Sequence, residues 1–190
     1  SSGKMGYALA NSAAQQGADV TLICGPTAGN EAHPDVTLVS VTTADEMLAA
    51  CLEAYPTADA VIMAAAVADF KPSDTHSHKI KKEKNIDALA LEPTTDILAT
   101  LGATKTHQVL VGFALESNNA IENGQQKLIN KNLDAIVVNS LEDPGAAFGH
   151  NTNKISFLQR NKDAVHYPLK SKSEVAADIL SHLNSMLYDS

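Results

Sequence analysis

Short apolar runs, each long enough for one β-strand, recur along this chain between segments with a helical pattern. The runs are Ala18–Cys24, Val36–Val41, Ala58–Ala66, Gln108–Phe113 and Leu133–Asn139. The inner runs lack the polar alternation of a half-exposed strand, so we expect them to be covered on both faces. Strands that alternate with helices in this way form a parallel sheet with helices on both sides. The pattern therefore predicts an α/β fold of the Rossmann-like, doubly wound class.

Five helices are expected between and after these strands. They cover Tyr7–Gln16, Ala44–Ala54, Asp96–Ala103, a segment that runs to about Asn132, and Ser173–Leu187. Gly17 follows the first helix in the position typical of a helix stop. Thr42 or Thr43 is placed to cap the second helix, and Thr95 to cap the third.

The last part of the chain has a different pattern. Ile155–Leu158 and Ala164–Tyr167 flank the polar segment Gln159–Asp163, which predicts a C-terminal hairpin. A chain of 190 residues suits one domain, so we assign residues 1–190 to a single domain. The chain opens on a helix, whereas a phosphate-binding loop normally follows a strand. We therefore expect the first strand of the fold to be missing before residue 1.

Composition excludes several classes of protein. The chain has 14 Lys+Arg against 22 Asp+Glu, a net charge of −8, so we expect no nucleic-acid or membrane-surface partner. The longest apolar run, Ala60–Ala68, has about half the length of a membrane span. Cys24 and Cys51 match no zinc signature, and we interpret them as buried thiols in the reducing cytoplasm.

Basic residues are concentrated in one polar stretch, Asp69–Asp87, which precedes a short strand expected over Ala88–Leu91. Lys79, Lys81, Lys82 and Lys84 lie there, and the chain has a single arginine, Arg160. A long loop without periodicity is more often a functional flap or a disordered segment than a plain connector. Lys79 and its neighbours are therefore interpreted either as a flap that closes over phosphates or as a solvated charge run.

Candidate ligand-binding residues follow the predicted strands or open a helix. The opening segment Ser1-Ser2-Gly3-Lys4-Met5-Gly6 is either a phosphate cradle at a helix N-terminus or a helix cap with packing glycines. Ala65 and Ala66 end a strand in small side chains that let a ligand approach the backbone, or simply pack tightly. Asp69 follows, placed to bind a metal or a hydroxyl, or to make a turn.

Further candidates lie in the second half of the chain. Phe113 ends a strand, where its ring stacks on a base or belongs to the core. Lys127 and Lys131 are four residues apart on one helix face and repel each other unless an anion lies between them; the alternative is two exposed lysines. Asn139 ends the next strand and hydrogen-bonds a ligand or makes a turn. The seven histidines form no ligand set, so the sequence identifies no metal site.

Together these segments resemble the phosphopantothenate–cysteine ligase family of coenzyme A synthesis. The resemblance covers nearly the whole chain. The segments resemble the bacterial form of the family, which usually uses CTP. It depends on Ser1–Gly6, on Ala64–Phe70 followed by Lys79-Ile80-Lys81-Lys82, on Gly112–Asn118, and on Lys127 and Lys131-Asn132-Leu133-Asp134.

The resemblance implies both ligands and residue roles. The substrates would be 4′-phosphopantothenate, cysteine and CTP with Mg²⁺, and Lys79 would be catalytic. The nucleotide would be bound by a set of residues spread along the chain: Ser1, Gly3, Gly6, Ala65, Ala66, Asp69, Thr94, Thr95, Phe113, Lys127 and Lys131. Thr94 and Thr95 stand where relatives have Asn-Pro. A homodimer is also implied, and in many bacteria this ligase is fused to a flavin-dependent decarboxylase.

The family also has a first strand and a catalytic asparagine before its Ser-Ser-Gly-Lys-Met-Gly segment. Neither is present in this sequence. We therefore expect a truncated or partly ordered protein rather than a different function. In the implied reaction, an acyl-cytidylate forms with release of pyrophosphate, and cysteine then displaces CMP.

Two other functions stay open. A nicotinamide-dependent reductase would need a Gly-x-Gly-x-x-Gly turn and an acidic residue after the second strand, and the sequence shows neither. A non-catalytic nucleotide-binding module is favoured by the absent asparagine.

Overall fold

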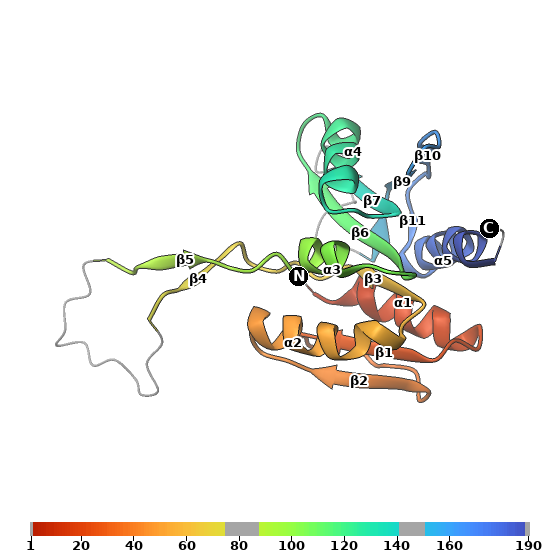
Figure 1. Ribbon diagram of the computed structural model, residues 1–190. Helices are drawn as coiled ribbons and strands as arrows, with labels where there is room; N and C mark the ends of the chain where they lie inside the picture. Colours follow the sequence, from red (N-terminus) through yellow and green to blue (C-terminus); the bar gives the residue numbers. More distant parts are fainter. Residues whose placement is uncertain (1, 75–87, 141–150, 189–190) are drawn as a thin grey trace.

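A five-stranded sheet forms the centre of the molecule, in a computed structural model that describes residues 2–74, 88–140 and 151–188. The strand order is β10-β9-β7-β6-β3 (Figure 1). The strands are β3 (Ala60–Met63), β6 (Val109–Glu116), β7 (Ala135–Ser140), β9 (Ile155–Gln159) and β10 (Val165–His166). β3, β6 and β7 are mutually parallel, while β9 is antiparallel to β7 and β10 antiparallel to β9. The sequence prediction of a mainly parallel sheet and a C-terminal hairpin is confirmed.

Three two-stranded ladders complete the described strands. β1 (Val20–Cys24) and β2 (Val36–Ser40) pair in parallel, and no hydrogen-bonded ladder in the described ranges joins them to β3. β8 (Thr152–Asn153) pairs with β11 (Lys170–Ser171). β4 (Phe70–Pro72) and β5 (Leu91–Pro93) form an antiparallel ribbon that projects away from the rest of the molecule (Figure 1). We call this ribbon the arm.

Helices cover both faces of the sheet, as predicted. The helices are α1 (Lys4–Gln15), α2 (Ala44–Ala54), α3 (Ile97–Thr104), α4 (Ala120–Asn130) and α5 (Lys172–Tyr188), with a short 3₁₀ turn at Tyr55–Thr57. α1 and α5 share one hydrophobic cluster with alternate residues of β6 and β7. α2, α3 and α4 share another cluster with the intervening residues of the same strands. The alternation follows from the two-residue period of a strand.

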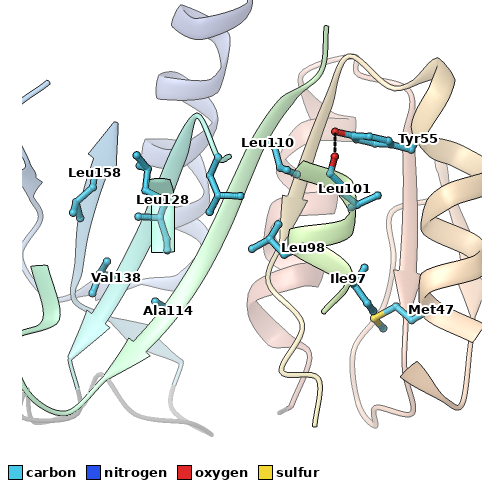
Figure 2. Packing of buried hydrophobic residues seen from close by; sticks show 12 residues of the cluster. Met47, Tyr55, Ile97, Leu98, Leu101, Leu110, Ala114, Leu128, Val138 and Leu158 are labelled. Carbon is cyan, nitrogen blue, oxygen red and sulfur yellow. Dashed lines mark hydrogen bonds between the residues drawn. The ribbon is translucent and has the colours of Figure 1, made fainter. Parts of the chain in front are cut away.

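Figure 2 shows how α2 and α3 are joined to the sheet on the second face. Met47 of α2 packs beside Ile97 of α3, and Leu98 and Leu110 lie between α3 and β6. The buried Tyr55 hydroxyl donates a hydrogen bond to the carbonyl of Leu101 at 3.0 Å. This bond satisfies a polar group that would otherwise be costly to bury.

The first turns of α2 and α3 test the capping residues that the sequence predicts. The Thr43 hydroxyl accepts from the Glu46 amide at 3.1 Å, and the Glu46 carboxylate accepts from the Thr43 amide, so α2 begins with a capping box. The prediction that Thr95 caps the third helix is wrong. Asp96 occupies the cap and accepts from the Ala99 amide at 2.9 Å, because a carboxylate at this position satisfies an exposed helix N–H.

Three other segments differ from prediction in extent. The strand expected over Ala58–Ala66 is confined to β3, whose side chains are only half-buried because β3 pairs with β6 alone. The short strand expected over Ala88–Leu91 is β5, which starts at Leu91. The polar stretch Asp69–Asp87 contains β4, and its remaining residues from 75 onward lie outside the described residues. In the part of the chain that the structure describes, no helix has the length and apolarity to cross a membrane.

Gly102 lets α3 pack directly against the end of α4. A Cβ atom built on Gly102 would lie 1.9 Å from the Lys131 carbonyl oxygen, which is backbone and cannot move aside. We expect Gly102→Ala to lower the free energy of unfolding by about 3 kcal/mol, measured by denaturant titration. Gly6→Ala is the matched control, since that helical glycine has open space and the change should alter stability by no more than about 1 kcal/mol. Equal stabilities for the two variants would contradict the expectation.

His182 makes stability depend on pH in a defined window. Its ring stacks on Phe157 at 4.1 Å between centroids and is hydrogen-bonded to the Tyr167 hydroxyl at 2.7 Å. Burial lowers the pKa of His182, aided by Lys162 and opposed by Asp178. As the pH falls, His182 therefore binds a proton at a higher pH in the unfolded chain than in the folded protein. Its contribution to stability is complete above about pH 6.5 and falls as the pH drops below that value.

Denaturant titration between pH 5 and 8 checks this expectation. The carboxylates whose pKa is lowered, such as Glu116 and Asp96, lose their contribution only below about pH 4.3, so they do not interfere in this window. His182→Gln should remove most of the fall between pH 6.5 and 5. An unchanged slope in that variant would assign the effect to another group.

Candidate functional site

Several candidate residues follow or end the parallel strands β3, β6 and β7 at one edge of the central sheet, whereas Phe113, expected at the end of its strand, lies inside β6. In a doubly wound sheet, ligands bind outside the carboxyl ends of the strands. The chain passes this edge after β3 at Ala65, Ala66 and Asp69, at the end of β6, and at Asn139 of β7. The fold therefore brings segments that are far apart in the sequence to one edge.

The opening segment places Gly3 at the start of α1. Gly3 has a φ of 74°, and a Cβ there would lie 2.7 Å from the Thr27 side chain, so both the backbone and the packing require glycine. Asn30 holds the segment by donating to the Ser2 carbonyl at 2.8 Å. Gly6 lies inside the first turn, and a Cβ on it would meet nothing within 4 Å. This turn is therefore open to the approach of a ligand, while Ser1 lies outside the described residues.

The segment after β3 is joined to the segment before α3. Ala65, Ala66 and Asp69 are exposed, and the Asp69 carbonyl accepts a hydrogen bond from the Thr94 amide at 2.9 Å. The Thr94 hydroxyl oxygen is buried and has no hydrogen-bond partner, whereas Thr95 is exposed. Asp69 and Thr94, which the sequence grouped only through the family resemblance, are thus neighbours in the fold.

Phe113 is partly buried and packs against the hydrophobic cluster of the α1 and α5 face. Lys127 belongs to α4, which packs on the opposite face of the same strands. The structure therefore brings both residues to β6 but does not place the aromatic ring and the ammonium group on one face.

Lys127 and Lys131 each have a carboxylate partner. The Lys127 ammonium donates to Glu116 at 2.5 Å, and the Lys131 ammonium lies 2.8 Å from Asp96. Burial opposes the ionisation of both acids, but hydrogen bonds from the lysines and from neighbouring amides outweigh it and lower the pKa of Glu116 and of Asp96. Each lysine thus has its own carboxylate partner, so no shared anion is needed to offset the repulsion between the two ammonium groups.

Asn139 has the strongest structural mark of a ligand-binding residue among the strand ends. Its side-chain oxygen is buried and has no hydrogen-bond partner. In the sheet it lies between Leu115 of β6 and Ile155 of β9. Buried polar atoms are nearly always hydrogen-bonded, so this oxygen, which has no partner among the described residues, makes Asn139 a candidate for contact with a ligand or a bound water. The sequence signal was only a polar residue at the end of an apolar strand.

Replacing Asn139 by alanine should therefore separate binding from stability. We expect the free energy of unfolding to change by less than about 1 kcal/mol, because no hydrogen bond of the side chain is lost. Nucleotide affinity should fall about tenfold, the usual size for one hydrogen bond. Calorimetric titration with CTP and a denaturation curve measure the two quantities, with Asn130→Ala, at an exposed position of α4, as control. Strong destabilisation with unchanged affinity would contradict this assignment.

No preformed metal cage is found within residues 2–74, 88–140 and 151–188, where no three His, Cys, Asp or Glu side chains gather. Asp69 is the first exposed carboxylate after the end of β3. One carboxylate fits a Mg²⁺ ion that is held mainly by nucleotide phosphates and water. The proposed catalytic residue Lys79 lies outside the described residues.

The fold and this strand edge define an α/β domain of the doubly wound class with a ligand site at the carboxyl ends of its parallel strands. Residues 1–187 match the family described as DNA/pantothenate metabolism flavoprotein C-terminal domain. The chain belongs to this family.

Three individual proteins show the extent of the similarity. A Bacillus subtilis coenzyme A biosynthesis bifunctional protein CoaBC is 40% identical over 186 residues, which are 98% of this chain and 46% of that protein. A cysteine/cysteine sulfinic acid decarboxylase from an unknown prokaryotic organism is 47% identical over 99% of this chain and 53% of its own. The solved C-terminal domain of a CoaBC protein superposes with a TM-score of 0.84 at 39% identity, covering 100% of this chain and 85% of that one. The chain thus spans about half the length of the CoaBC protein and of the decarboxylase.

Proposed function

We propose that this chain is a ligase domain that joins 4′-phosphopantothenate to cysteine in coenzyme A synthesis. The observation that carries the proposal is the match over residues 1–187 to the family model. The similarity to the solved C-terminal domain of CoaBC supports the same assignment.

The chemical problem is that a carboxylate is a poor electrophile. In the proposed first step, a carboxylate oxygen of 4′-phosphopantothenate attacks the α-phosphorus of CTP, and the bond to pyrophosphate breaks. The product is an acyl-cytidylate. In the second step the cysteine amine attacks the acyl carbon, the bond to CMP breaks, and the amine loses a proton as the amide forms. Charge develops on phosphate oxygens in the first step, and Lys79 would offset it.

The described residues have roles that match this chemistry. The first turn of α1, where a Cβ on Gly6 would meet nothing within 4 Å, would offer the helix N-terminus to a phosphate. Ala65 and Ala66 would let the nucleotide approach the backbone, and the Thr94 and Asn139 side-chain oxygens, which have no hydrogen-bond partner within the described residues, would each accept from a donor on it. Lys127 and Lys131 present their ammonium groups on the opposite side of β6 from Phe113. Mg²⁺ bound to the phosphates would supply further charge neutralisation, with Asp69 as its protein carboxylate.

We also propose a homodimer formed through the arm. Phe70 is 60% exposed and Leu91 56% exposed on β4 and β5, and Leu89 beside them is 64% exposed. A two-stranded ribbon is marginal by itself, and its open edges and apolar side chains favour pairing with another ribbon. Lys71 fixes the base of the arm through Asp45 of α2 at 2.5 Å. A second copy of this chain offers an identical ribbon, as a twofold-symmetric interface requires.

A cytoplasmic location and a decarboxylase partner follow from the same proposal. The CoaBC relatives are named as bifunctional and are about twice as long as this chain. The decarboxylase name of the 47% identical relative refers to a protein of which this chain covers 53%. Release of carbon dioxide from cysteine is therefore the alternative activity to be measured beside ligation.

One assay separates the alternatives in the full-length protein. CTP, Mg²⁺, 4′-phosphopantothenate and cysteine are mixed with the protein, and pyrophosphate is measured, with ATP in a parallel reaction. Pyrophosphate that requires all components supports the ligase, and a CTP rate above the ATP rate supports CTP as the nucleotide. Carbon dioxide released from cysteine without nucleotide, or loss of NADPH absorbance, would replace the ligase by a decarboxylase or a reductase. Nucleotide binding without turnover would instead support a non-catalytic nucleotide-binding module.

A further inference from the structure

Glu116 lies at the end of β6 and uses both oxygens of its carboxylate. One oxygen accepts from the Lys127 ammonium at 2.5 Å, and the other accepts from the Asn123 amide at 3.0 Å. Asn123 and Lys127 are four residues apart on α4 and therefore lie on one helix face. The Asn123 amide also donates to the Asn118 carbonyl at 3.0 Å, so the loop before α4 is tied to the same group.

The two ends of the Glu116–Lys127 pair differ in exposure. The Glu116 side chain is 11% exposed, whereas the Lys127 side chain is 45% exposed. The carboxylate is thus the anchored partner, and the ammonium is the partner that solvent or a ligand can reach. A free lysine side chain occupies many rotamers, and ordering them costs about 2 kcal/mol when a ligand binds. Holding the side chain in place before binding removes much of that cost.

The second lysine of the helix is held differently. Lys131 pairs with Asp96, but the Asp96 side chain is 48% exposed and also caps α3. Asp96 therefore has a helix-stabilising role of its own, while the side-chain hydrogen bonds of Glu116 within the described residues both come from α4, from Asn123 and Lys127. Within the described residues, the contacts of Glu116 serve mainly to place Lys127.

We infer that Glu116 is a positioning residue of the nucleotide site, which fixes the Lys127 ammonium at the carboxyl end of β6 for contact with the bound nucleotide. The inference rests on the proposed function, which places Lys127 among the residues that contact CTP. Glu116 itself touches neither substrate nor reacting atoms in this role. Its effect passes through Lys127 and belongs to affinity rather than to the chemical step.

A charge argument and a positioning argument predict opposite results for Glu116→Gln. Removing a negative charge near an anionic nucleotide would by itself tighten binding. Glutamine keeps the shape and can still accept from Asn123, but it no longer holds the ammonium. We expect the dissociation constant and the KM for CTP to rise about tenfold, with kcat changed less than about twofold. Asn123→Ala removes the second hydrogen bond to the Glu116 carboxylate. It should raise the dissociation constant and the KM for CTP by less, about threefold.

Titration calorimetry with CTP and Mg²⁺ and steady-state kinetics test the inference in the full-length protein. Glu122→Gln is the control, the same change at an exposed acid in the first turn of α4. The decisive result is the double variant: in a Lys127→Met background, Glu116→Gln should cause no further loss of affinity. Additive losses, or wild-type affinity in Glu116→Gln, would overturn the inference.

Thermal denaturation of each variant separates this role from a merely structural one. A lowered melting temperature in Glu116→Gln with unchanged CTP affinity would assign Glu116 to stability alone and overturn the inference. CTP binding without pyrophosphate release in the wild type would reject the ligase and still leave the effect of Glu116 measurable. A wild-type protein that binds neither CTP nor ATP would reject both proposals.

Discussion

Glutamine in place of Lys79 is expected to lower the turnover number of the ligase reaction by about 100- to 1000-fold. The reason is that the first step builds negative charge on phosphate oxygens, and one donor aimed at such charge is worth about 3–4 kcal/mol. Glutamine keeps the length and the polarity of the side chain but removes the charge. If Lys79 acts in catalysis alone, the free energy of unfolding should change by less than about 0.5 kcal/mol. Pyrophosphate release under saturating substrates measures the effect.

Lys82→Gln is the matched control, because it removes the same charge from the same lysine-rich segment. Its turnover should stay within about threefold of wild type. Equal losses in the two variants would show that only the overall charge of the segment matters. Wild-type turnover in Lys79→Gln would remove Lys79 from the catalytic machinery.

Phe70→Glu combined with Leu91→Glu is expected to convert the proposed dimer to a monomer and to lower ligase activity at least tenfold. Both side chains are more than half exposed on the arm, so the charges disturb an interface rather than the core. Burial of an unpaired charge between two ribbons would cost more than the exposed apolar surface contributes. Activity should fall with the proposed dimer because Asp69 and Thr94, which belong to the candidate site, directly adjoin the two strands of the arm. Light scattering after gel filtration measures the mass.

Ile129→Glu is the control for this experiment. Ile129 is 65% exposed on α4, far along the chain from the arm. The variant should remain dimeric and active. A dimer that persists in the Phe70 and Leu91 variant would place the interface on another surface, and a monomer with full activity would separate the dimer from catalysis.

The order of strands and helices was predictable because it depends on local patterns. The apolar runs that become β6 and β7, and the threonine followed three residues later by glutamate that begins α2, carry their signal within a few residues. The errors also have local causes. Thr95 and Asp96 are both good capping residues, and only the backbone geometry selects Asp96. The alanine run after β3 is as apolar as the strand itself, so the sequence does not mark where pairing with β6 ends.

The candidate site was predictable as a location and not as a set of contacts. Asp69 and Thr94 were grouped through the family resemblance, and the structure joins them by a backbone hydrogen bond. Asn139 was one polar residue among several until its oxygen was found buried and unpaired. Glu116 belonged to the Gly112–Asn118 motif but carried no signal for a role of its own, since an acid at the end of an apolar strand is common.

The sequence by itself determined the class of fold, the order of its elements, and the family to which the chain belongs, because periodicity and short motifs are written along the chain. The tertiary structure decided which charges face each other and which polar atoms lack a partner. Lys127 meets Glu116 across 11 positions, and Lys131 meets Asp96 across α3, β6 and α4. Such pairs depend on how the strands are ordered and how the helices lie on the sheet, and no local pattern carries that information.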